Sequence, residues 1–342
     1  MKEIFRQIQA FLGASPRPLL VILGPTASGK TGCSIELAHM LGQSRRGMEL
    51  WGRDISAPQL SKVEIINGDS RQLYRFLSIG TAKISQEEMQ GIPHHLIDVL
   101  DPKEEATAAW YKQEAVRTIG EIQKRGNVPL LVGGSMLYVS AVIDNLEFVA
   151  EADPQLREKL SREYDRDQGA ALMRTLEERD PETALSLDPR NKVYLIRALE
   201  ICLLAQGKAS LAKKKSACPF DLFILGVTLP REDLHQRINE RVRRMFEAGW
   251  VDEVRELLAQ GYTTDDPGLE SHGYREIAAA VRSGKWKAPR LCSGQVESGK
   301  FSTEQEQSLI AEISAKSRQY AKRQMTWWRG DSRIRWMADN AS

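Results

Sequence analysis

Gly24-Pro25-Thr26-Ala27-Ser28-Gly29-Lys30-Thr31 is the stretch of this chain that decides its fold. It follows the apolar run 19–23 and leads into the helix-compatible segment 32–41, so a strand, a glycine loop and a helix succeed one another. This order is the context in which the pattern G-x-x-x-x-G-K-[ST] forms a phosphate-binding loop. The alternative is a glycine-rich turn without a ligand, which the spacing and the Lys-Thr ending disfavour.

The same eight residues predict how a phosphate compound is held. The glycines let consecutive backbone amides turn toward a phosphate, and the N-terminus of the following helix adds its positive dipole end. Lys30 supplies a point charge, and the Thr31 hydroxyl is a ligand for Mg²⁺. Two phosphate groups fit such a loop, but the loop alone does not identify the compound.

Composition is that of an ordinary globular protein, because 42% of the 342 residues are apolar and 27% are charged. This length predicts two domains, or one large domain with an insertion. No apolar run approaches the roughly 20 residues that span a bilayer, and residues 1–18 lack a signal-peptide pattern. We therefore expect a cytoplasmic protein without membrane contact. The widely spaced Cys33, Cys202, Cys218 and Cys292 predict neither a zinc site nor a disulfide framework.

Apolar runs alternate with helical segments along the chain, as in a parallel α/β sheet flanked by helices. A helix is expected at 107–125. Strand character is found at 19–23, 63–67, 93–102, 128–135 and 220–229.

Two of these strands end in residues that bear on function. The strand 63–67 is followed by Asp69, which belongs at the sheet edge where ligands gather, unless it only caps the next turn. The strand 128–135 ends in Gly-Gly-Ser, without the acidic residue that helps P-loop nucleotidases hold Mg²⁺. This weighs against ordinary nucleotide hydrolysis. His94 and His95 invite a metal hypothesis, but without a third ligand we favour structural histidines near the sheet edge.

Residues 150–217 are charged and helix-forming, without a convincing strand. Three Asp-Pro pairs, at 153–154, 180–181 and 188–189, each fit the start of a helix. Because strand character returns at 220–229, we predict an all-helical insertion domain at 150–217 within a discontinuous P-loop α/β core, 1–149 and 218–342. The polar stretches 43–62 and 286–300 and the lysine run 213–215 are predicted to be surface loops.

Two helices near the C-terminus carry most of the candidate basic residues. A long amphipathic helix is expected at 234–261, with Arg237 and Arg241 one turn apart. A final helix is expected at 303–329, and between 316 and 335 seven basic residues face one acidic residue, with aromatic residues interleaved. Such a segment can contact RNA. It can equally be an amphipathic core helix with its apolar side inward, and both descriptions fit one helix.

A set of motifs, in order over nearly the whole chain, resembles the tRNA dimethylallyltransferase family in its bacterial-type short form. The motifs are GPTASGKT at 24–31, INGDSRQLY at 66–74, IGTAK at 79–83, PHHLIDVLDP at 93–102, PLLVGGSMLY at 129–138, IRALEI at 196–201, HGYREI at 272–277 and RQYAKRQMTWWR at 318–329. The resemblance implies transfer of a dimethylallyl group from its diphosphate to the exocyclic amine of the adenosine immediately 3′ of the anticodon.

The resemblance also implies roles for individual residues. Asp69 would accept the amine proton, and residues 24–31 would bind the diphosphate leaving group with Arg241. Thr31 would ligate Mg²⁺, with Asp69 acting through water, and Ser135 would complete the catalytic set. The residues implied in tRNA binding are Asp69, Ser70, Arg71, Gln72, Arg157, Arg197, Gly273, Tyr274, Arg275, Lys322, Arg323, Gln324, Trp327 and Arg329.

The sequence departs from the family pattern in three places. Ser135 replaces a usual Thr, 191–194 lacks a usual arginine, and His272 stands where an apolar residue is more usual. These differences concern the tRNA grip more than the reaction. The implied partners are the tRNA anticodon stem-loop and dimethylallyl diphosphate, with the protein as a monomer. A P-loop small-molecule or nucleotide kinase and a catalytically inactive RNA-binding protein are the alternatives.

Overall fold

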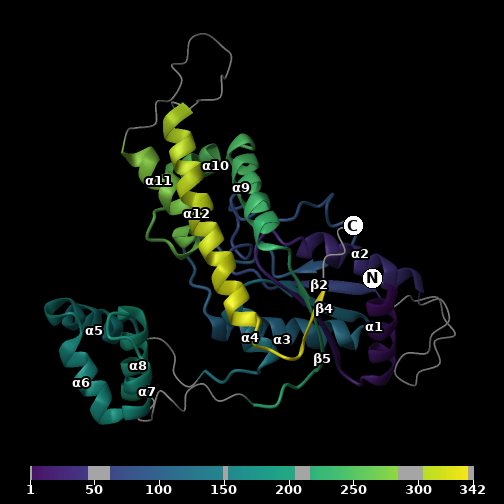
Figure 1. The fold of residues 1–342 in the computed structure, drawn as a ribbon, viewed down its shortest axis with the longest axis horizontal. Helices are drawn as coiled ribbons and strands as arrows, with labels where there is room; N and C mark the ends of the chain where they lie inside the picture. Colours follow the sequence, from purple (N-terminus) through teal and green to yellow (C-terminus); the bar gives the residue numbers. More distant parts are fainter. Residues whose placement is uncertain (1, 45–61, 149–152, 205–215, 284–302, 338–342) are drawn as a thin grey trace, which may run out of the picture. The chain divides into compact units, whose positions relative to one another are not determined.

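A parallel sheet forms the centre of the larger of two compact units. The computed structural model describes residues 2–44, 62–148, 153–204, 216–283 and 303–337. Within them, the strand order is β3-β2-β4-β1-β5-β6, with every pair parallel (Figure 1). The strands are β1 (Pro18–Leu23), β2 (Val63–Asn67), β3 (His94–His95), β4 (Val128–Gly133), β5 (Asp221–Val227) and β6 (Ile334–Met337). The predicted α/β class is confirmed.

Helices cover the sheet, so its strands are apolar on both faces. Leu20 and Ile22 of β1 share a buried cluster with side chains of α1 (Lys2–Ala14) and α2 (Lys30–Ser44). α3 (Ala108–Lys124) packs against β2 and β4, and the Thr107 side chain caps its N-terminus by accepting a hydrogen bond from the Trp110 amide.

The C-terminal part of this unit adds a layer of helices next to the sheet. α12 (Thr303–Trp328) packs along α9 (Arg231–Glu247), and α10 (Trp250–Ala259) contacts α11 (Tyr274–Arg282) (Figure 1). A short 3₁₀ helix, η2 (Pro267–Glu270), precedes α11. On α12, Ile313, Ala321 and Trp328 are buried, whereas Lys322 and Arg323 are exposed. The final helix therefore has both an apolar inner side and a basic outer side.

The chain divides into two compact units, Met1–Val139 with Phe220–Ser342, and Ser140–Pro219. The division falls within α4 (Met136–Ile143). The second unit contains helices with a core of their own, which includes Leu176, Leu195 and Leu199. These helices are α5 (Pro154–Asp167), α6 (Ala170–Arg179), α7 (Pro181–Ser186) and α8 (Lys192–Leu204).

Three predicted elements differ in the structure. The helix expected at 234–261 is two helices, because Gly249 adopts φ +94° between α9 and α10. The strand expected at 93–102 keeps only two paired residues, because Leu96 and Asp98 have left-handed backbones. Asp153 and Asp180 cap helices as expected, but the pair at 188–189 does not begin one.

That third pair forms a turn for a local reason. The Asp188 side chain accepts the Arg190 amide at 3.0 Å, an Asx-type contact two residues along the chain, and α8 begins only at Lys192. α1, α4, α11 and β6 are helices and a strand that the sequence analysis did not anticipate. The loop predicted at 43–62 begins later than expected, because residues 43–44 still belong to α2. Residues 45–61 and 286–300, the lysines 213–215 and Cys292 lie outside the described residues.

Candidate active site

The glycine loop follows β1 directly and precedes α2. Only glycine fits at position 24, because the Cβ of any other residue would lie 2.1 Å from the Val227 carbonyl oxygen of β5. The Lys30 ammonium donates to the Pro25 carbonyl at 2.6 Å, so the lysine folds over its own loop. The Ser28 hydroxyl is buried and has no hydrogen-bond partner among the described residues. A buried hydroxyl without a partner is what a loop built for an anion would hold.

The carboxyl ends of β1, β2 and β4 meet at this loop, as expected of parallel strands. The Gly68 amide donates to the Val132 carbonyl at 2.7 Å, and the Ser135 amide donates to the Gly68 carbonyl at 3.2 Å. The segment after β2 and the end of β4 approach so closely that a Cβ on Gly133 would lie 2.2 Å from the Gly68 carbonyl carbon. Glycine at both strand ends therefore brings Asp69 and Ser135 to one edge of the sheet.

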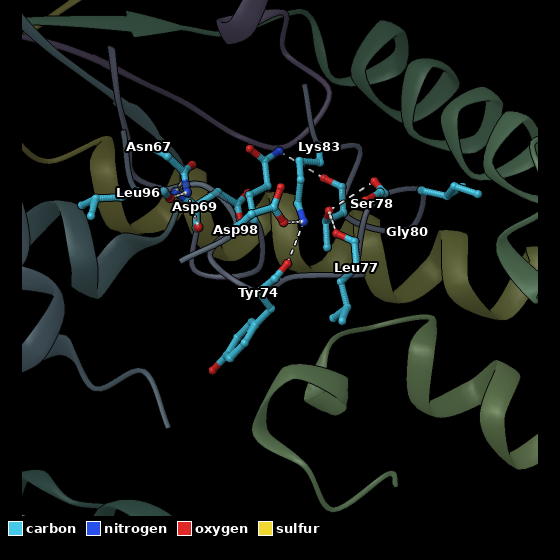
Figure 2. A network of polar contacts seen from close by, with 12 residues as sticks. Asn67, Asp69, Tyr74, Leu77, Ser78, Gly80, Lys83, Leu96 and Asp98 are labelled. Carbon is cyan, nitrogen blue, oxygen red and sulfur yellow. Dashed lines mark hydrogen bonds and ion pairs between the residues drawn. The ribbon is translucent and has the colours of Figure 1, made fainter. Parts of the chain in front are cut away.

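Asp69 is fixed by its neighbours on both sides. Its Oδ1 accepts the Arg71 amide at 2.9 Å, and its own amide donates to the Asn67 side chain at 2.9 Å. The Asn67 side chain also donates to the carbonyls of Asp69 and Leu96, at 3.0 and 2.8 Å (Figure 2). The Tyr111 hydroxyl donates to the Asn67 carbonyl at 2.8 Å. The Asp69 carboxylate is thus held in place through Oδ1, while its Oδ2 accepts no hydrogen bond from the described residues.

Two cations share the electrostatic field of this carboxylate. Burial lowers the pKa of Lys30 to about 8, although the Asp69 charge opposes the shift and the Arg241 charge adds to it. Burial also lowers the pKa of Arg241, again against the effect of Asp69. The Arg241 guanidinium donates to the Thr26 hydroxyl at 3.2 Å and to the Thr81 carbonyl at 3.3 Å. An anion with more than one charge would relieve the repulsion between these two cations.

Gln324 of α12 joins the glycine loop to the end of β4. Its side-chain oxygen accepts the Thr26 amide at 2.8 Å, and its nitrogen donates to the Gly134 carbonyl at 2.8 Å. The side chain is 2% exposed. The buried amide therefore positions the loop, and the contact of Gln324 with tRNA stays a prediction.

The Ser135 hydroxyl lies in the same small network. It accepts the Ser70 amide at 2.8 Å and lies 3.1 Å from the Ser70 hydroxyl. Tyr320 of α12 is nearby, and burial and the Asp69 charge raise its pKa to about 12 despite a hydrogen bond with Ser135. The tyrosine is therefore a neutral hydroxyl beside the carboxylate at physiological pH.

Arg71 and Gln72, within the motif INGDSRQLY at 66–74, connect loops to one another. The Arg71 guanidinium donates to the Pro267 carbonyl at 3.0 Å. The Gln72 side chain donates to the carbonyls of Thr81 and Ala82, at 3.2 and 3.1 Å. Both side chains thus have structural partners in addition to the tRNA contact that the resemblance implies.

The HGYREI motif also proves to be mainly structural. Tyr274 is fully buried, and its hydroxyl donates to Glu253 at 2.6 Å, so its side chain has a structural role and its tRNA contact stays a prediction. Gly273 has φ +98°, and a Cβ there would lie 1.9 Å from the Trp250 ring. Arg275 is exposed and donates to Glu270 at 2.9 Å.

The predicted RNA-contacting residues at 322–329, on α12 and directly after it, are accessible apart from Gln324. Lys322, Arg323 and Arg329 are exposed, and the Trp327 side chain is 48% exposed. The Arg323 guanidinium lies 5.6 Å from the centre of the Tyr320 ring. This side of the helix combines positive charge with aromatic surface.

Arg157 and Arg197 belong to the second unit, where both bind the fully buried Glu200. Arg197 donates to its carboxylate at 2.7 Å and Arg157 at 3.1 Å. These two arginines therefore stabilise the helices of that unit, and their contact with tRNA stays a prediction.

A cleft of about 1730 Å³ lies between the glycine loop and α9. Its cations include Lys30, Lys83, Arg237, Arg241 and Arg244, and its acids are Glu88, Glu232, Asp233 and Glu240. The charges are mixed, but burial lowers the pKa of both Lys30 and Arg241, the two cations that share the field of Asp69.

The two histidines are structural, as favoured from the sequence. His94 bonds the Ile92 carbonyl at 2.8 Å, and His95 bonds Glu64 at 2.6 Å. No group of three potential metal ligands of the His, Cys, Asp or Glu type occurs in the described part of the chain. Sequence reasoning missed Asn67, Tyr111 and Glu253, because their role depends on contacts with distant segments.

These features define a class of protein: an α/β protein with a glycine loop at the carboxyl edge of a parallel sheet, where a fixed carboxylate stands beside two half-buried cations. The family model described as IPP transferase matches residues 72–331. The chain belongs to this family, and the resemblance drawn from its motifs is confirmed.

Relatives match over nearly the full chain. A tRNA dimethylallyltransferase of Geobacter sulfurreducens is 36% identical, over 94% of this chain and 92% of the relative. One of Bacillus subtilis is 35% identical, over 94% and 90%. The crystal structure of a tRNA isopentenylpyrophosphate transferase from Bacillus halodurans is 35% identical and covers 94% of this chain and 89% of its own, with a TM-score of 0.61.

None of the helices in the described ranges has the length and apolar character needed to cross a membrane.

Proposed function

We propose that this chain transfers a dimethylallyl group from dimethylallyl diphosphate to the exocyclic amine of the adenosine immediately 3′ of the anticodon in tRNA, and releases diphosphate. One observation carries the proposal: Asp69 is held beside Lys30 and Arg241 at the glycine loop. A base for the amine and cations for the leaving group are thus within one site. The relatives named tRNA dimethylallyltransferase support this assignment.

The bond changes follow from these charges. The amine nitrogen attacks the allylic carbon, the carbon–oxygen bond to the diphosphate breaks, and Asp69 takes the proton that leaves the nitrogen. An adenine amine is a weak nucleophile, so a positioned base contributes a factor of about 10² to 10⁴. The charge that grows on the diphosphate is stabilised by the loop amides, Lys30 and Arg241, which are already oriented before the reaction.

Mg²⁺ fits this site as an ion carried largely by the diphosphate. It prefers few protein ligands together with phosphate oxygens and water, and the donor set offers the Thr31 hydroxyl, with Asp69 acting through water, rather than a cage of carboxylates. When bound, the ion would neutralise charge on the leaving group.

The acceptor is a base that must leave its stack to reach the site, which is least costly in a single-stranded loop. We infer that the anticodon stem-loop lies along the exposed side of α12, where Lys322, Arg323, Trp327 and Arg329 offer charge and stacking surface. With tRNA as acceptor, we expect the protein to act in the cytoplasm, as a monomer.

A transfer assay tests the proposal. Purified protein, Mg²⁺, labelled dimethylallyl diphosphate and an unmodified anticodon stem-loop with three consecutive adenosines are combined, and the label is located by nuclease digestion and mass spectrometry. Label on the adenosine 3′ of the anticodon is expected. Phosphorylation with ATP, and no transfer to the stem-loop or to full-length tRNA, would instead favour a kinase.

Asp69→Asn separates chemistry from binding. The amide keeps an oxygen for the Arg71 amide but has little basicity, so turnover is expected to fall about 10² to 10⁴-fold while tRNA affinity changes little. Asp221→Asn is the matched control, because Asp221 caps the opposite edge of the sheet, where it accepts the Arg17 amide at 3.0 Å. Normal turnover of Asp69→Asn at saturating tRNA would rule out Asp69 as the base.

A further inference from the structure

Glu253 of α10 holds the turn that contains the IGTAK motif. Its carboxylate accepts the amides of Ser78 and Ile79, each at 2.8 Å, and that of Gly80 at 3.4 Å. It also accepts the Tyr274 hydroxyl at 2.6 Å. Within the described residues no lysine or arginine forms an ion pair with it. A carboxylate satisfied by successive backbone amides fixes the conformation of that backbone.

Trp250, one helical turn before Glu253, packs against the same turn at Gly80. A Cβ on Gly80 would lie 2.0 Å from the indole nitrogen. The ring therefore occupies the space that a side chain at position 80 would need. Residues 78–80 are thus held between a carboxylate and a fully buried indole, both from α10.

The turn leads directly to the contact that orients Arg241. The Thr81 carbonyl accepts the Arg241 guanidinium at 3.3 Å and the Gln72 side chain at 3.2 Å. The Thr81 hydroxyl donates back to the Leu77 carbonyl at 2.7 Å. Further along, Lys83 donates to the Tyr74 carbonyl at 2.6 Å and binds Asp98, so both ends of the segment are anchored (Figure 2).

We propose that Glu253 is a positioning residue for diphosphate binding: through the 78–81 turn and the Thr81 carbonyl, it holds Arg241 against the glycine loop. This inference rests on the proposed function, which supplies the diphosphate as substrate, whereas the contacts that carry it concern only the anion site. Glu253 lies on another helix than Arg241 and touches no reacting atom.

The test is a double-mutant cycle on the affinity for inorganic pyrophosphate with Mg²⁺, measured by calorimetry. Glu253→Ala is expected to weaken binding about 10- to 100-fold, because a small displacement of an orienting group is sufficient for such a loss. In an Arg241→Ala background, Glu253→Ala is expected to have almost no further effect, since the two residues act through one contact. Equal losses in both backgrounds would overturn the proposal.

Two variants control for fold and chemistry. Glu256→Ala changes an exposed residue on the same helix and should leave pyrophosphate affinity unchanged. Glu253→Gln keeps an oxygen for the amides and should recover most of the affinity. If Glu253→Ala does not fold, the glutamine variant replaces it in the cycle, with an expected loss of about threefold that again disappears without Arg241.

Wild-type affinity retained by a folded Glu253→Ala protein would also overturn the proposal. Failure of the proposed function looks different: pyrophosphate would still bind to the wild type and the cycle would be unchanged, but no label would reach the stem-loop. A kcat of the transfer reaction that falls without any change in pyrophosphate affinity would contradict the positioning role.

Discussion

Lys30 and Arg241 are two cations that share one carboxylate in a partly desolvated place. This is unfavourable for the empty protein, because burial disfavours both charged forms and each cation repels the other. A diphosphate reverses the balance, since its charge stabilises both. Holding the two cations close together costs free energy in the empty protein, and binding of the anion would offset that cost.

A pH dependence follows from the lowered pKa of Lys30, which is about 8. Because the anion favours the protonated lysine, dimethylallyl diphosphate affinity should be constant below pH 8 and fall about tenfold per pH unit above it. The lowered pKa also affects stability. Below pH 8 the lysine is charged in both the folded and the unfolded protein, and its burial lowers the free energy of unfolding. This destabilisation disappears as pH rises from 8 toward the ordinary lysine pKa, because the folded protein then holds the neutral form. Calorimetric titration across pH 6.5 to 9.5 measures the affinity.

Lys30→Met is the matched comparison. It should bind the diphosphate more weakly at neutral pH and show no break near pH 8. An identical pH profile in wild type and Lys30→Met would mean that another group is responsible.

The residues of the site differ in how far a sequence can reveal them. Lys30 and Thr31 belong to a local motif that has a mechanism, and Asp69 follows from its place after a strand. Glu253 and Gln324 act through hydrogen bonds to segments more than 170 positions away, so no local pattern identifies their partners. The burial of Gln324 was not evident from the sequence either, because its neighbours Lys322 and Arg323 are exposed.

At the scale of elements, the break between α9 and α10 is made by one glycine. The apolar spacing from Leu234 to Phe246 predicted a single helix at 234–261, and apolar residues do continue at Trp250 and Val254. Backbone geometry overrides the pattern, because φ +94° at Gly249 is outside the helical region. The break allows α10 to run in its own direction and to present Glu253 and Trp250 to the IGTAK turn.

Two identical substitutions should therefore have opposite effects. Gly249→Ala is expected to lower the free energy of unfolding by about 1 kcal/mol, because only the backbone conformation opposes the methyl group and no atom lies within 4 Å of it. Gly120→Ala, within α3 and equally open, is expected to raise it by about 0.5–1 kcal/mol through helix propensity. Urea unfolding of both variants measures the difference.

Stabilisation by Gly249→Ala would mean that the turn between α9 and α10 can change without loss.

Other elements were also predicted with less success. β6 has only four residues, at a sheet edge, and its exposed Arg335 interrupts the apolar character. The buried strands β1, β2, β4 and β5 were found because parallel strands covered on both faces are mainly apolar, although Glu64 lies within β2.

At the scale of the whole molecule, the two units have separate cores and separate polar anchors. In the second unit the anchor is Glu200, which is fully buried and accepts Arg197, Arg157 and the Asp153 amide. Burial alone would raise the pKa of Glu200, but these hydrogen bonds outweigh it and the pKa lies below its ordinary value. Its contribution to stability is therefore complete above the ordinary pKa and is lost as pH falls through the lowered one.

Glu200→Ala should destabilise the second unit selectively. The change leaves the Asp153 amide without its acceptor, and the two arginines are partly exposed and can be hydrated, so the expected loss is about 2 kcal/mol. All seven tryptophans lie outside residues 140–219, so their fluorescence does not report on this unit. Thermal unfolding followed by helical circular dichroism should begin earlier than unfolding followed by tryptophan fluorescence.

Glu178→Ala, an exposed change on α6, is the control and should leave the two curves as in the wild type. Hydrogen exchange at residues 154–204 should accelerate in Glu200→Ala at neutral pH, with the β1 amides unaffected. Parallel loss of protection in both units would indicate that they unfold together.

The hydrogen bonds of Gln324 have a consequence for the timing of synthesis. The glutamine and the Thr26 amide are separated by 298 positions along the chain. At about 5–20 residues per second, a ribosome needs roughly 15–60 s to pass from one to the other. During that interval the glycine loop has already been made, but the side chain that fastens it to β4 does not yet exist. A growing chain therefore gains this connection between the glycine loop and the end of β4 only once α12 has been made.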